Sequence, residues 1–233
     1  MLLATDLDGT FLAGDADARA QLYALIDARP DIQLAYVTGR NFALVAPLLD
    51  DPQVAKPDYI ICDVGTTVVD CAGLAVEPLQ SQICDHWPGE ERVVAAMAGV
   101  PGLVRQDQPQ TRRCSYYCEP EAVTTAVHEI VAALGCDLLF SADRYLDVLP
   151  RGVNKGSTLM RFVAHAGIDP AQVLVAGDTL NDLSMYEQGF KGVCVGASEP
   201  ALLAATRERS HVLHATRPGC GGILDALHHF ALI

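Results

Sequence analysis

Short apolar runs alternate with amphipathic stretches through the first third of the chain. The runs "MLLAT", "IQLAYVTG" and "YIICDVG" have the length and composition of buried strands. Between them, residues 15–29 and 41–50 carry apolar side chains at helical spacing, with Asp15 as a helix cap. The order strand, helix, strand, helix, strand predicts right-handed crossovers and a parallel sheet. The segment "TTVVD" that follows predicts a short strand that turns back.

The middle of the chain, residues 81–151, has a different pattern. Helical stretches at 89–99 and 121–135 alternate with strand-like pieces at 111–119 and 136–150. The last piece has the pattern of two strands around a turn. Neighbouring strands with helices between them predict an α+β insert, whose antiparallel sheet has one solvated face.

The α/β alternation returns after residue 151. Strand patterns occupy 172–178, 191–196 and 211–215, and helical patterns occupy 154–167, 181–188, 199–208 and 221–233. We therefore predict a Rossmann-like, doubly wound parallel-sheet core built from residues 1–80 and 152–233. Residues 81–151 form the inserted α+β domain.

Composition narrows the class of partner. The chain has 233 residues, of which 50% are hydrophobic, enough for one core with a smaller inserted domain. Its formal net charge of -13 makes nucleic acid and anionic membranes poor partners, since both are negative. We find neither a secretory signal nor a run of eighteen apolar residues, and expect a cytoplasmic protein without a membrane span.

Eight cysteines are scattered along the chain, and no CxxC motif occurs. We interpret most of them as small, buried, reduced hydrophobic residues. A zinc site is the alternative.

Two acidic motifs follow predicted strands. Asp6 and Asp8 stand in "DLDGT" after the first strand, and Asp178 and Asp182 stand in "AGDTLND" after a later one. Each motif alone is compatible with an ordinary turn or helix cap. If the two strands are neighbours, the four carboxylates converge and cannot all stay ionised without a cation. Mg²⁺ is the hard cation typical of such a site.

Two further positions suggest anion binding. In "VTGR", Thr38 offers a hydroxyl, and Gly39 allows a ligand to approach the backbone. Lys155 stands at a predicted helix start, where its charge opposes the helix dipole unless an anion lies nearby. A plain strand-end turn and a solvated lysine are the alternatives.

Taken together, the four pieces resemble the haloacid dehalogenase (HAD) superfamily of phosphohydrolases. Its motifs D-x-D-G-T, Thr or Ser, Lys and G-D-x-x-x-D occur here in that order as "DLDGT", Thr38, Lys155 and "GDTLND". The long gap between Thr38 and Lys155 matches the subgroup whose C2-type cap follows the third core strand. The segments "VGTTV" and "LDVLPRGVNKGSTL" resemble the sucrose-phosphate phosphatase branch.

The resemblance implies a HAD fold with an α+β cap and assigns the catalytic roles. Asp6 would attack phosphorus and form an aspartyl-phosphate, and Asp8 would act as acid and base. Mg²⁺ would be held by Asp6, Asp178 and the backbone carbonyl of Asp8, with Asp182 orienting its waters or Lys155. The residues expected to contact the phosphate are Gly9, Thr38, Gly39, Lys155 and Asn181.

Substrate choice is expected to come from the cap and the loops that face it. The candidates are Arg40, Asn41, Gly65, Thr66, Tyr116, Arg144 and Asp147. Tyr116 and Tyr117 alternate along a strand, so only one of them is expected to face the site, and Tyr116 is the residue that we select. Arg40, Arg112, Arg113 and Arg144 are candidates for a locally positive pocket.

The function implied is Mg²⁺-dependent hydrolysis of a sugar phosphate, either sucrose 6-phosphate or a related glycoside or hexose phosphate. Mannosyl- or glucosylglycerate phosphate, a broad range of sugar phosphates, a phosphomutase reaction and a non-catalytic sugar-phosphate sensor are the alternatives. The expected partner is a phosphorylated sugar, and the oligomeric state stays open between a monomer and a weak dimer.

Overall fold

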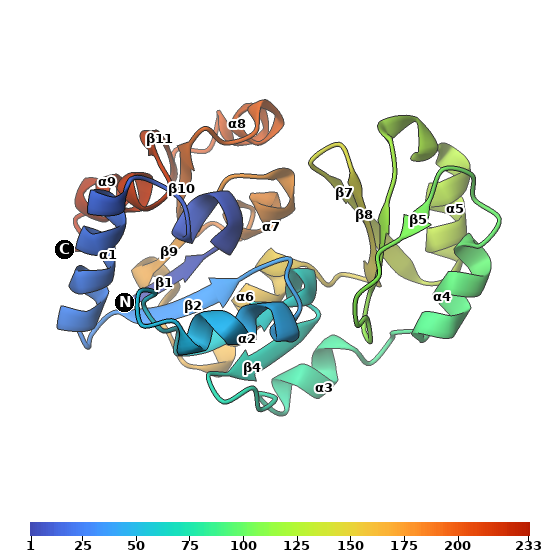
Figure 1. The fold of residues 1–233 in the computed structure, drawn as a ribbon, viewed down its shortest axis with the longest axis horizontal. Coiled ribbons are helices and arrows are strands. Elements are labelled where there is room, and N and C mark those ends of the chain that lie inside the picture. Colours follow the sequence, from blue (N-terminus) through green and yellow to red (C-terminus); the bar gives the residue numbers. More distant parts are fainter.

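A seven-stranded sheet forms the larger part of the molecule, on the left of Figure 1. The computed structural model describes all residues 1–233. The strand order is β11-β10-β9-β1-β2-β3-β4, and every neighbouring pair is parallel except β3 and β4. The strands are β1 (Leu2–Thr5), β2 (Gln33–Val37), β3 (Tyr59–Cys62), β4 (Thr67–Asp70), β9 (Val173–Gly177), β10 (Lys191–Gly196) and β11 (Val212–Pro218).

Helices cover both faces of this sheet. The first hydrophobic cluster includes residues of α1 (Ala16–Ala28), α2 (Phe42–Asp50) and α9 (Cys220–His229). The second includes residues of α3 (Leu79–Ile83), α6 (Lys155–His165), α7 (Leu183–Tyr186) and α8 (Pro200–Thr206). Leu3 packs in the first cluster, whereas Leu2 and Ala4 pack in the second, because successive side chains of a strand point to opposite faces. The core is therefore doubly wound, as predicted.

Polar residues cap the helices that lead to the site. The carboxylate of Asp15 accepts the N–H of Ala18 at the start of α1, which confirms the predicted cap. Asn154 and Ser157 form a reciprocal capping box at the start of α6. These caps fix where each helix begins, and Lys155 is thereby held in the first turn of α6.

A smaller antiparallel sheet with the order β5-β6-β8-β7 forms the second body, on the right of Figure 1. Its strands are β5 (Val104–Arg105), β6 (Cys114–Tyr117), β7 (Cys136–Ser141) and β8 (Tyr145–Pro150). Helices α4 (Glu90–Met97) and α5 (Thr125–Ala133) cover the face turned away from the large sheet (Figure 1). The predicted antiparallel α+β insert is thus present, and we call it the cap.

The sequence predicts that the inserted domain begins at residue 81. Ile83 of α3 nevertheless packs in the second cluster, against the large sheet. The limits 81 and 151 of the cap stay a prediction.

Six of the eight cysteines are buried, all are free, and no cysteine belongs to a group that could hold a metal. None of the helices combines the length and apolar composition needed to cross a bilayer.

The contact between α6 and α7 generates a stability prediction. A Cβ at Gly156 would overlap the backbone of Ser184 in α7, and backbone cannot move aside as a flexible side chain can. We expect Gly156→Ala to lower the free energy of unfolding by about 1–3 kcal/mol, as overpacking does. Urea denaturation measures it.

Gly99→Ala is the matched control, because a Cβ at Gly99 would meet no atom within 4 Å. An equal effect of the two substitutions on the free energy of unfolding would contradict the tight contact between α6 and α7.

Candidate active site

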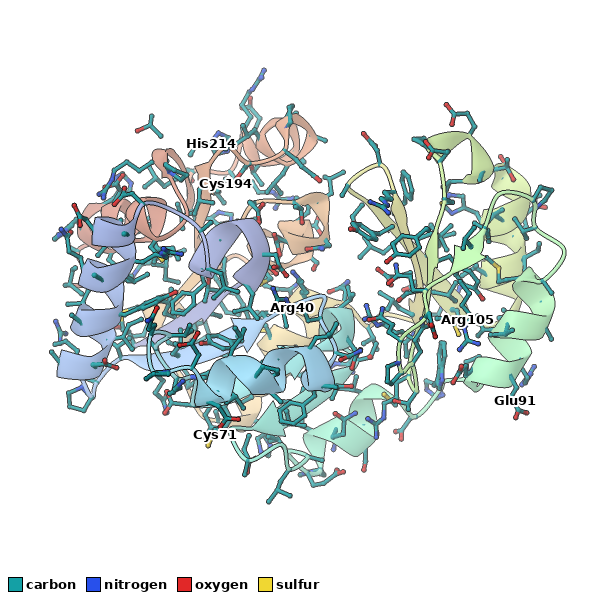
Figure 2. The ribbon with its side chains drawn as sticks, in the orientation of Figure 1. Arg40, Cys71, Glu91, Arg105, Cys194 and His214 are labelled. Atoms are coloured by element: carbon teal, nitrogen blue, oxygen red, sulfur yellow. The ribbon has the colours of Figure 1, made fainter.

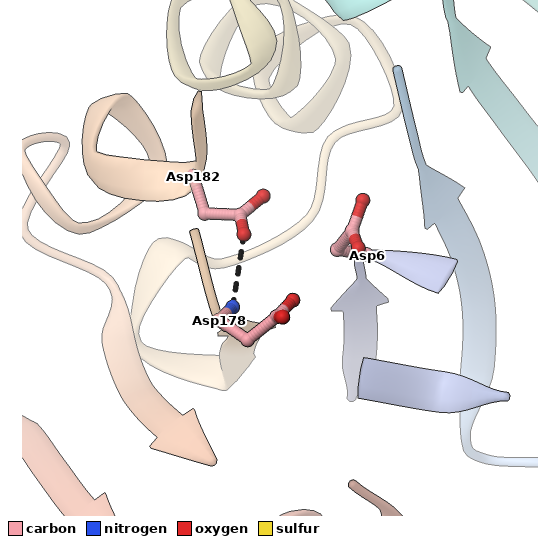
Figure 3. A group of neighbouring side chains, drawn as sticks. All are labelled: Asp6, Asp178 and Asp182. Carbon is pink, nitrogen blue, oxygen red and sulfur yellow. Dashed lines mark hydrogen bonds between the residues drawn. The ribbon is translucent and has the colours of Figure 1, made fainter. Parts of the chain in front are cut away.

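Three carboxylates meet where β1 and β9 end side by side. Thr5 pairs with Ala176 in the sheet, and the N–H of Asp6 donates to the carbonyl of Ala176 at 2.9 Å. Asp6, Asp178 and Asp182 each place a carboxylate oxygen within 4.8 Å of the other two (Figure 3). The two acidic motifs therefore form one cluster rather than two separate turns, as the adjacency of their strands requires.

Burial and mutual repulsion raise the pKa of two of these carboxyl groups. Burial raises the pKa of Asp6 to about 8, with Lys155 opposing the rise and Asp182 adding to it. Burial and the neighbouring Asp182 raise the pKa of Asp178 to about 6. A cation placed among the carboxylates would favour their ionised forms.

The donor set fits Mg²⁺. Asp6 and Asp178 each keep one carboxylate oxygen without a partner in the protein, since Lys155 takes the other oxygen of Asp6 and Thr10 that of Asp178. Oxygen-only ligands that include one or two carboxylates are typical of Mg²⁺ sites, which leave room for water and a phosphate.

Lys155 is completely buried in the middle of the site. Its Nζ donates to Oδ1 of Asp6 at 2.6 Å, of Asp182 at 2.7 Å and of Asn181 at 2.8 Å. Burial alone lowers the pKa of Lys155, but the carboxylates of Asp182 and Asp6 raise it above its usual value. The predicted nearby anion is therefore present as two carboxylates of the protein itself.

Asp182 is fully buried and engaged on both oxygens. Its Oδ1 accepts from Lys155, and its Oδ2 accepts the N–H groups of Asp178 at 2.9 Å and Thr179 at 3.0 Å. Figure 3 shows the bond to Asp178. Asp182 thus holds Lys155 and the loop after β9 in place, consistent with the orienting role that the resemblance gives it.

The loop after β1 brings Asp8 back toward the cap. Gly9 has a φ of 77°, and a Cβ there would overlap the carboxylate of Asp178. Only glycine satisfies both constraints. The next residue, Thr10, donates its hydroxyl to Asp178 at 2.8 Å. The "DGT" of the motif therefore shapes the carboxylate cluster itself.

Arg40 pairs with Asp8 across the site. Its Nε lies 2.8 Å from Oδ2 of Asp8, and its Nη2 lies 2.5 Å from Oδ1. The Asp8 side chain is 63% exposed, in contrast with the buried Asp6. Thr38 is buried, and its hydroxyl accepts the N–H of Arg40. Figure 2 shows Arg40 at the side of the large sheet that faces the cap.

A cavity of about 370 Å³ lies over these residues, between the two bodies. From the core it is lined by Asp6, Asp8, Gly39, Arg40, Leu44, Val64, Thr179 and Asn181, and from the cap by Gln106, Gln108, Arg113, Tyr117, Ser141, Ala142, Tyr145 and Asp147. A larger, mostly apolar cavity of about 460 Å³ between α5 and β7 contains none of the converging carboxylates. The polar cavity is therefore the candidate active site.

The selection of Tyr116 as a residue that faces the site is wrong. Tyr116 pairs with Leu146, and both belong to the cluster under α4 and α5. Tyr117 pairs with Tyr145, and both line the cavity. The alternation along the strand was predicted, but its phase depends on which face the helices cover.

Gly65 and Thr66 also require correction. Gly65 packs against the backbone of Asn154 and Lys155, Thr66 is fully buried, and neither lines the cavity. Their neighbour Val64 does line the cavity, although it is almost completely buried.

Two candidates lie at the rim of the cavity. Asn41 caps α2 and donates to Gln108 of the cap at 3.3 Å. Arg144 stacks over the rings of Tyr117 and Tyr145, at 4.8 and 5.9 Å from their centroids. Neither lines the cavity itself, whereas Arg40 and Asp147 do.

Cap residues that sequence reasoning missed supply much of the polar lining: Gln106, Gln108, Ser141 and Tyr145. No periodic pattern marks Gln106 and Gln108, because the chain bends at residues 107–108 instead of forming a strand.

Residues Asp63 and Val64, in the turn after β3, have left-handed backbone, with φ of 54° and 59°. Such backbone costs about 1–3 kcal/mol per non-glycine residue and persists only where surrounding contacts enforce it. Here the Asp63 carboxylate lies 3.1 Å from Nε of Arg113 in the cap. Burial raises the pKa of Asp63, and Arg113 opposes that rise.

Comparison with known proteins agrees with this geometry. A family model described as sucrose-6F-phosphate phosphohydrolase matches residues 1–231. The solved structure of the sucrose-phosphatase from Synechocystis sp. PCC6803, in complex with sucrose and phosphate, superposes with a TM-score of 0.88 and 29% identity. That match covers 99% of this chain and 98% of the other.

Two curated relatives add to the comparison. Glucosylglycerol-phosphate synthase of Pseudomonas anguilliseptica is 57% identical over 235 residues, which are all of this chain but 31% of that protein. Mannosylfructose-phosphate phosphatase of Agrobacterium fabrum is 30% identical over 242 residues, 99% of this chain and 97% of that protein. The chain therefore belongs to the sucrose-6F-phosphate phosphohydrolase family and is a phosphoric monoester hydrolase of the HAD superfamily.

Proposed function

We propose that this chain is a Mg²⁺-dependent phosphatase that hydrolyses a phosphorylated glycoside through an aspartyl-phosphate. One observation carries the proposal. Asp6, paired with the buried Lys155, borders a polar cavity that the cap roofs with hydrogen-bonding side chains. A carboxylate nucleophile on the core side, with cap side chains that can form hydrogen bonds to sugar hydroxyls, suits a phosphate ester of a sugar.

In the proposed reaction, an oxygen of Asp6 attacks phosphorus, and the bond between phosphorus and the sugar oxygen breaks. Asp8 gives its proton to the leaving sugar oxygen. A water molecule then attacks phosphorus, Asp8 takes the proton of that water, and the acyl-phosphate bond breaks to release phosphate and restore Asp6. Asp8 lines the same cavity as the buried Asp6 and is itself exposed, which suits this division of roles.

Lys155 and Thr38 hold the non-transferred phosphoryl oxygens in this proposal, together with Gly9, Gly39 and Asn181. To do so, Lys155 exchanges one of its three present hydrogen bonds for one to the phosphate. Mg²⁺ would be held by Asp6, Asp178 and the backbone carbonyl of Asp8. When bound, it offsets the repulsion between a carboxylate nucleophile and an anionic phosphate. Asp182 contributes by fixing Lys155 and the loop after β9.

The relatives suggest the class of sugar. The names of the three proteins described above refer to the phosphates of glucosylglycerol, mannosylfructose and sucrose. We infer a phosphorylated glycoside, with glucosylglycerol phosphate as the first substrate to test because that relative is 57% identical. Mannosyl- and glucosylglycerate phosphates, a phosphomutase reaction and binding without turnover are the competing outcomes. The cytoplasmic location and a monomer or weak dimer stay predictions.

The nucleophile gives the first activity prediction. Asp6→Asn is expected to lower the rate of phosphate release by at least about 10³-fold, because an amide cannot attack phosphorus as a carboxylate does. Steady-state phosphate release measures it. Asp17→Asn, an exposed change of the same kind in α1, is the control and should keep wild-type activity. Equal activity of the two variants would refute the role of Asp6.

The proposed Mg²⁺ site gives the second activity prediction. Chelation by EDTA is expected to abolish phosphate release, and added Mg²⁺ to restore it. Asp178→Asn is expected to weaken Mg²⁺ binding at least about tenfold, because it removes a ligand charge. Calorimetric titration with MgCl₂ measures the affinity. Full activity in EDTA, or unchanged affinity in the variant, would contradict the proposed site.

The proposed substrate class gives the third activity prediction. The value of kcat/KM should be at least about tenfold higher for the best of glucosylglycerol phosphate, sucrose 6-phosphate and mannosylfructose phosphate than for glucose 6-phosphate, since a second sugar or polyol unit gains contacts with the cap. A preference for the simple hexose phosphate would count against a glycoside substrate. Phosphate transfer to another hydroxyl of the sugar would identify a mutase.

A further inference from the structure

Arg113 is a buried cation of the cap that the proposed reaction leaves without a role. Only 3% of the residue is exposed, and it lines the cavity. Its Nε lies 3.1 Å from Oδ1 of Asp63 in the core, and its Nη1 lies 3.4 Å from Oδ1 of Asp147 in the cap. One guanidinium therefore joins a carboxylate from each body, and burial strengthens both ion pairs because little water screens them.

Asp147 has one oxygen free for a ligand. The residue is 6% exposed and lines the cavity. Its Oδ1 accepts hydrogen bonds from the hydroxyl of Ser115 and from Arg113, whereas its Oδ2 has no partner in the protein. This oxygen is open to the cavity, where water or a ligand can donate a hydrogen bond to it. A hydroxyl group in the cavity would supply the missing donor.

Asp63 connects the same guanidinium to the phosphate side of the site. The backbone N–H of Asp63 donates to the carbonyl of Arg40 at 2.9 Å, and that of Val64 donates to the carbonyl of Thr38 at 3.1 Å. The left-handed turn at Asp63 and Val64 directs the Asp63 carboxylate toward the cap. A contact that fixes Asp63 therefore also restrains the loop that carries Thr38 and Arg40.

We propose that Arg113 is a positioning and specificity-determining residue that couples sugar recognition to the phosphate-side loop. Its ion pair with Asp63 holds the cap against the core, and its ion pair with Asp147 turns the free oxygen of Asp147 toward a hydroxyl of the non-phosphorylated part of the substrate. The substrate class that gains from this arrangement is a polyhydroxylated phosphate ester long enough to span the cavity. This inference rests on the proposed phosphatase function.

The kinetic test compares two substrates. For the best glycoside phosphate, Arg113→Gln is expected to raise KM at least about tenfold, because Asp147 loses its orientation. For p-nitrophenyl phosphate, which has no sugar hydroxyl to offer, the loss in kcat/KM is expected to be at least about threefold smaller, because only the restraint on the phosphate-side loop is removed. Arg92→Gln is the matched control, because Arg92 is exposed on α4, on the far side of the cap from the cavity (Figure 1).

Asp63→Asn removes the other end of the core ion pair. It is expected to raise KM in the same way, and the double variant with Arg113→Gln should be no worse than about twofold beyond the poorer single variant, because coupled residues are not additive. An unchanged KM for the glycoside phosphate, or an equal loss on both substrates, would overturn the proposal.

A second readout needs no turnover. Hydrogen exchange followed by mass spectrometry should show the segment 62–68 exchanging at least about tenfold faster in Arg113→Gln and in Asp63→Asn, but not in Arg92→Gln. Unchanged exchange in both variants would overturn the coupling. If the wild-type protein hydrolyses no glycoside phosphate, the proposed function fails, and the exchange result still decides whether Arg113 restrains this loop.

Discussion

The site depends on one buried amine among crowded carboxylates. Lys155 has no exposure to solvent, and its three donated bonds end on Asp6, Asn181 and Asp182. Removing an ammonium group from water costs several kcal/mol unless opposite charge and good hydrogen bonds surround it. The fold provides both by ending β1 and β9 side by side and starting α6 opposite them. Three local features surround this amine. Asn154 caps α6, Gly156 packs against α7, and Gly9 packs against Asp178.

Fixed ion pairs organise the site of this acidic protein. The chain carries a formal net charge of -13, yet cations stand at the walls of the cavity. Arg40 pairs with Asp8, Arg113 pairs with Asp63 and Asp147, and Lys155 lies behind Asp6. Each cation is already balanced by carboxylates of the protein. The site is therefore organised before a phosphate arrives, as catalysis by fixed charges requires.

The core of the site was predictable from sequence because its motifs follow strand ends, and parallel strands bring their carboxyl ends to one edge of a sheet. The cap and the core turn that faces it were less predictable for three physical reasons. The phase of the strand at Tyr116 and Tyr117 is set by helices distant in sequence. The turn at Asp63 and Val64 uses left-handed backbone without the glycine that normally signals it. Strand β5 has only two residues, both exposed, so it shows no burial pattern and depends on pairing with β6.

If Asp6 is the nucleophile, it becomes phosphorylated during turnover, and the phosphorylated enzyme can be trapped. The enzyme is mixed with Mg²⁺ and a glycoside phosphate labelled at phosphorus, quenched in acid within one turnover, and digested for mass spectrometry. We expect an acyl-phosphate, labile to hydroxylamine, on the peptide that contains Asp6, and we expect none in Asp6→Asn. Rapid hydrolysis with no label on the protein, or with the label on another residue, would contradict it.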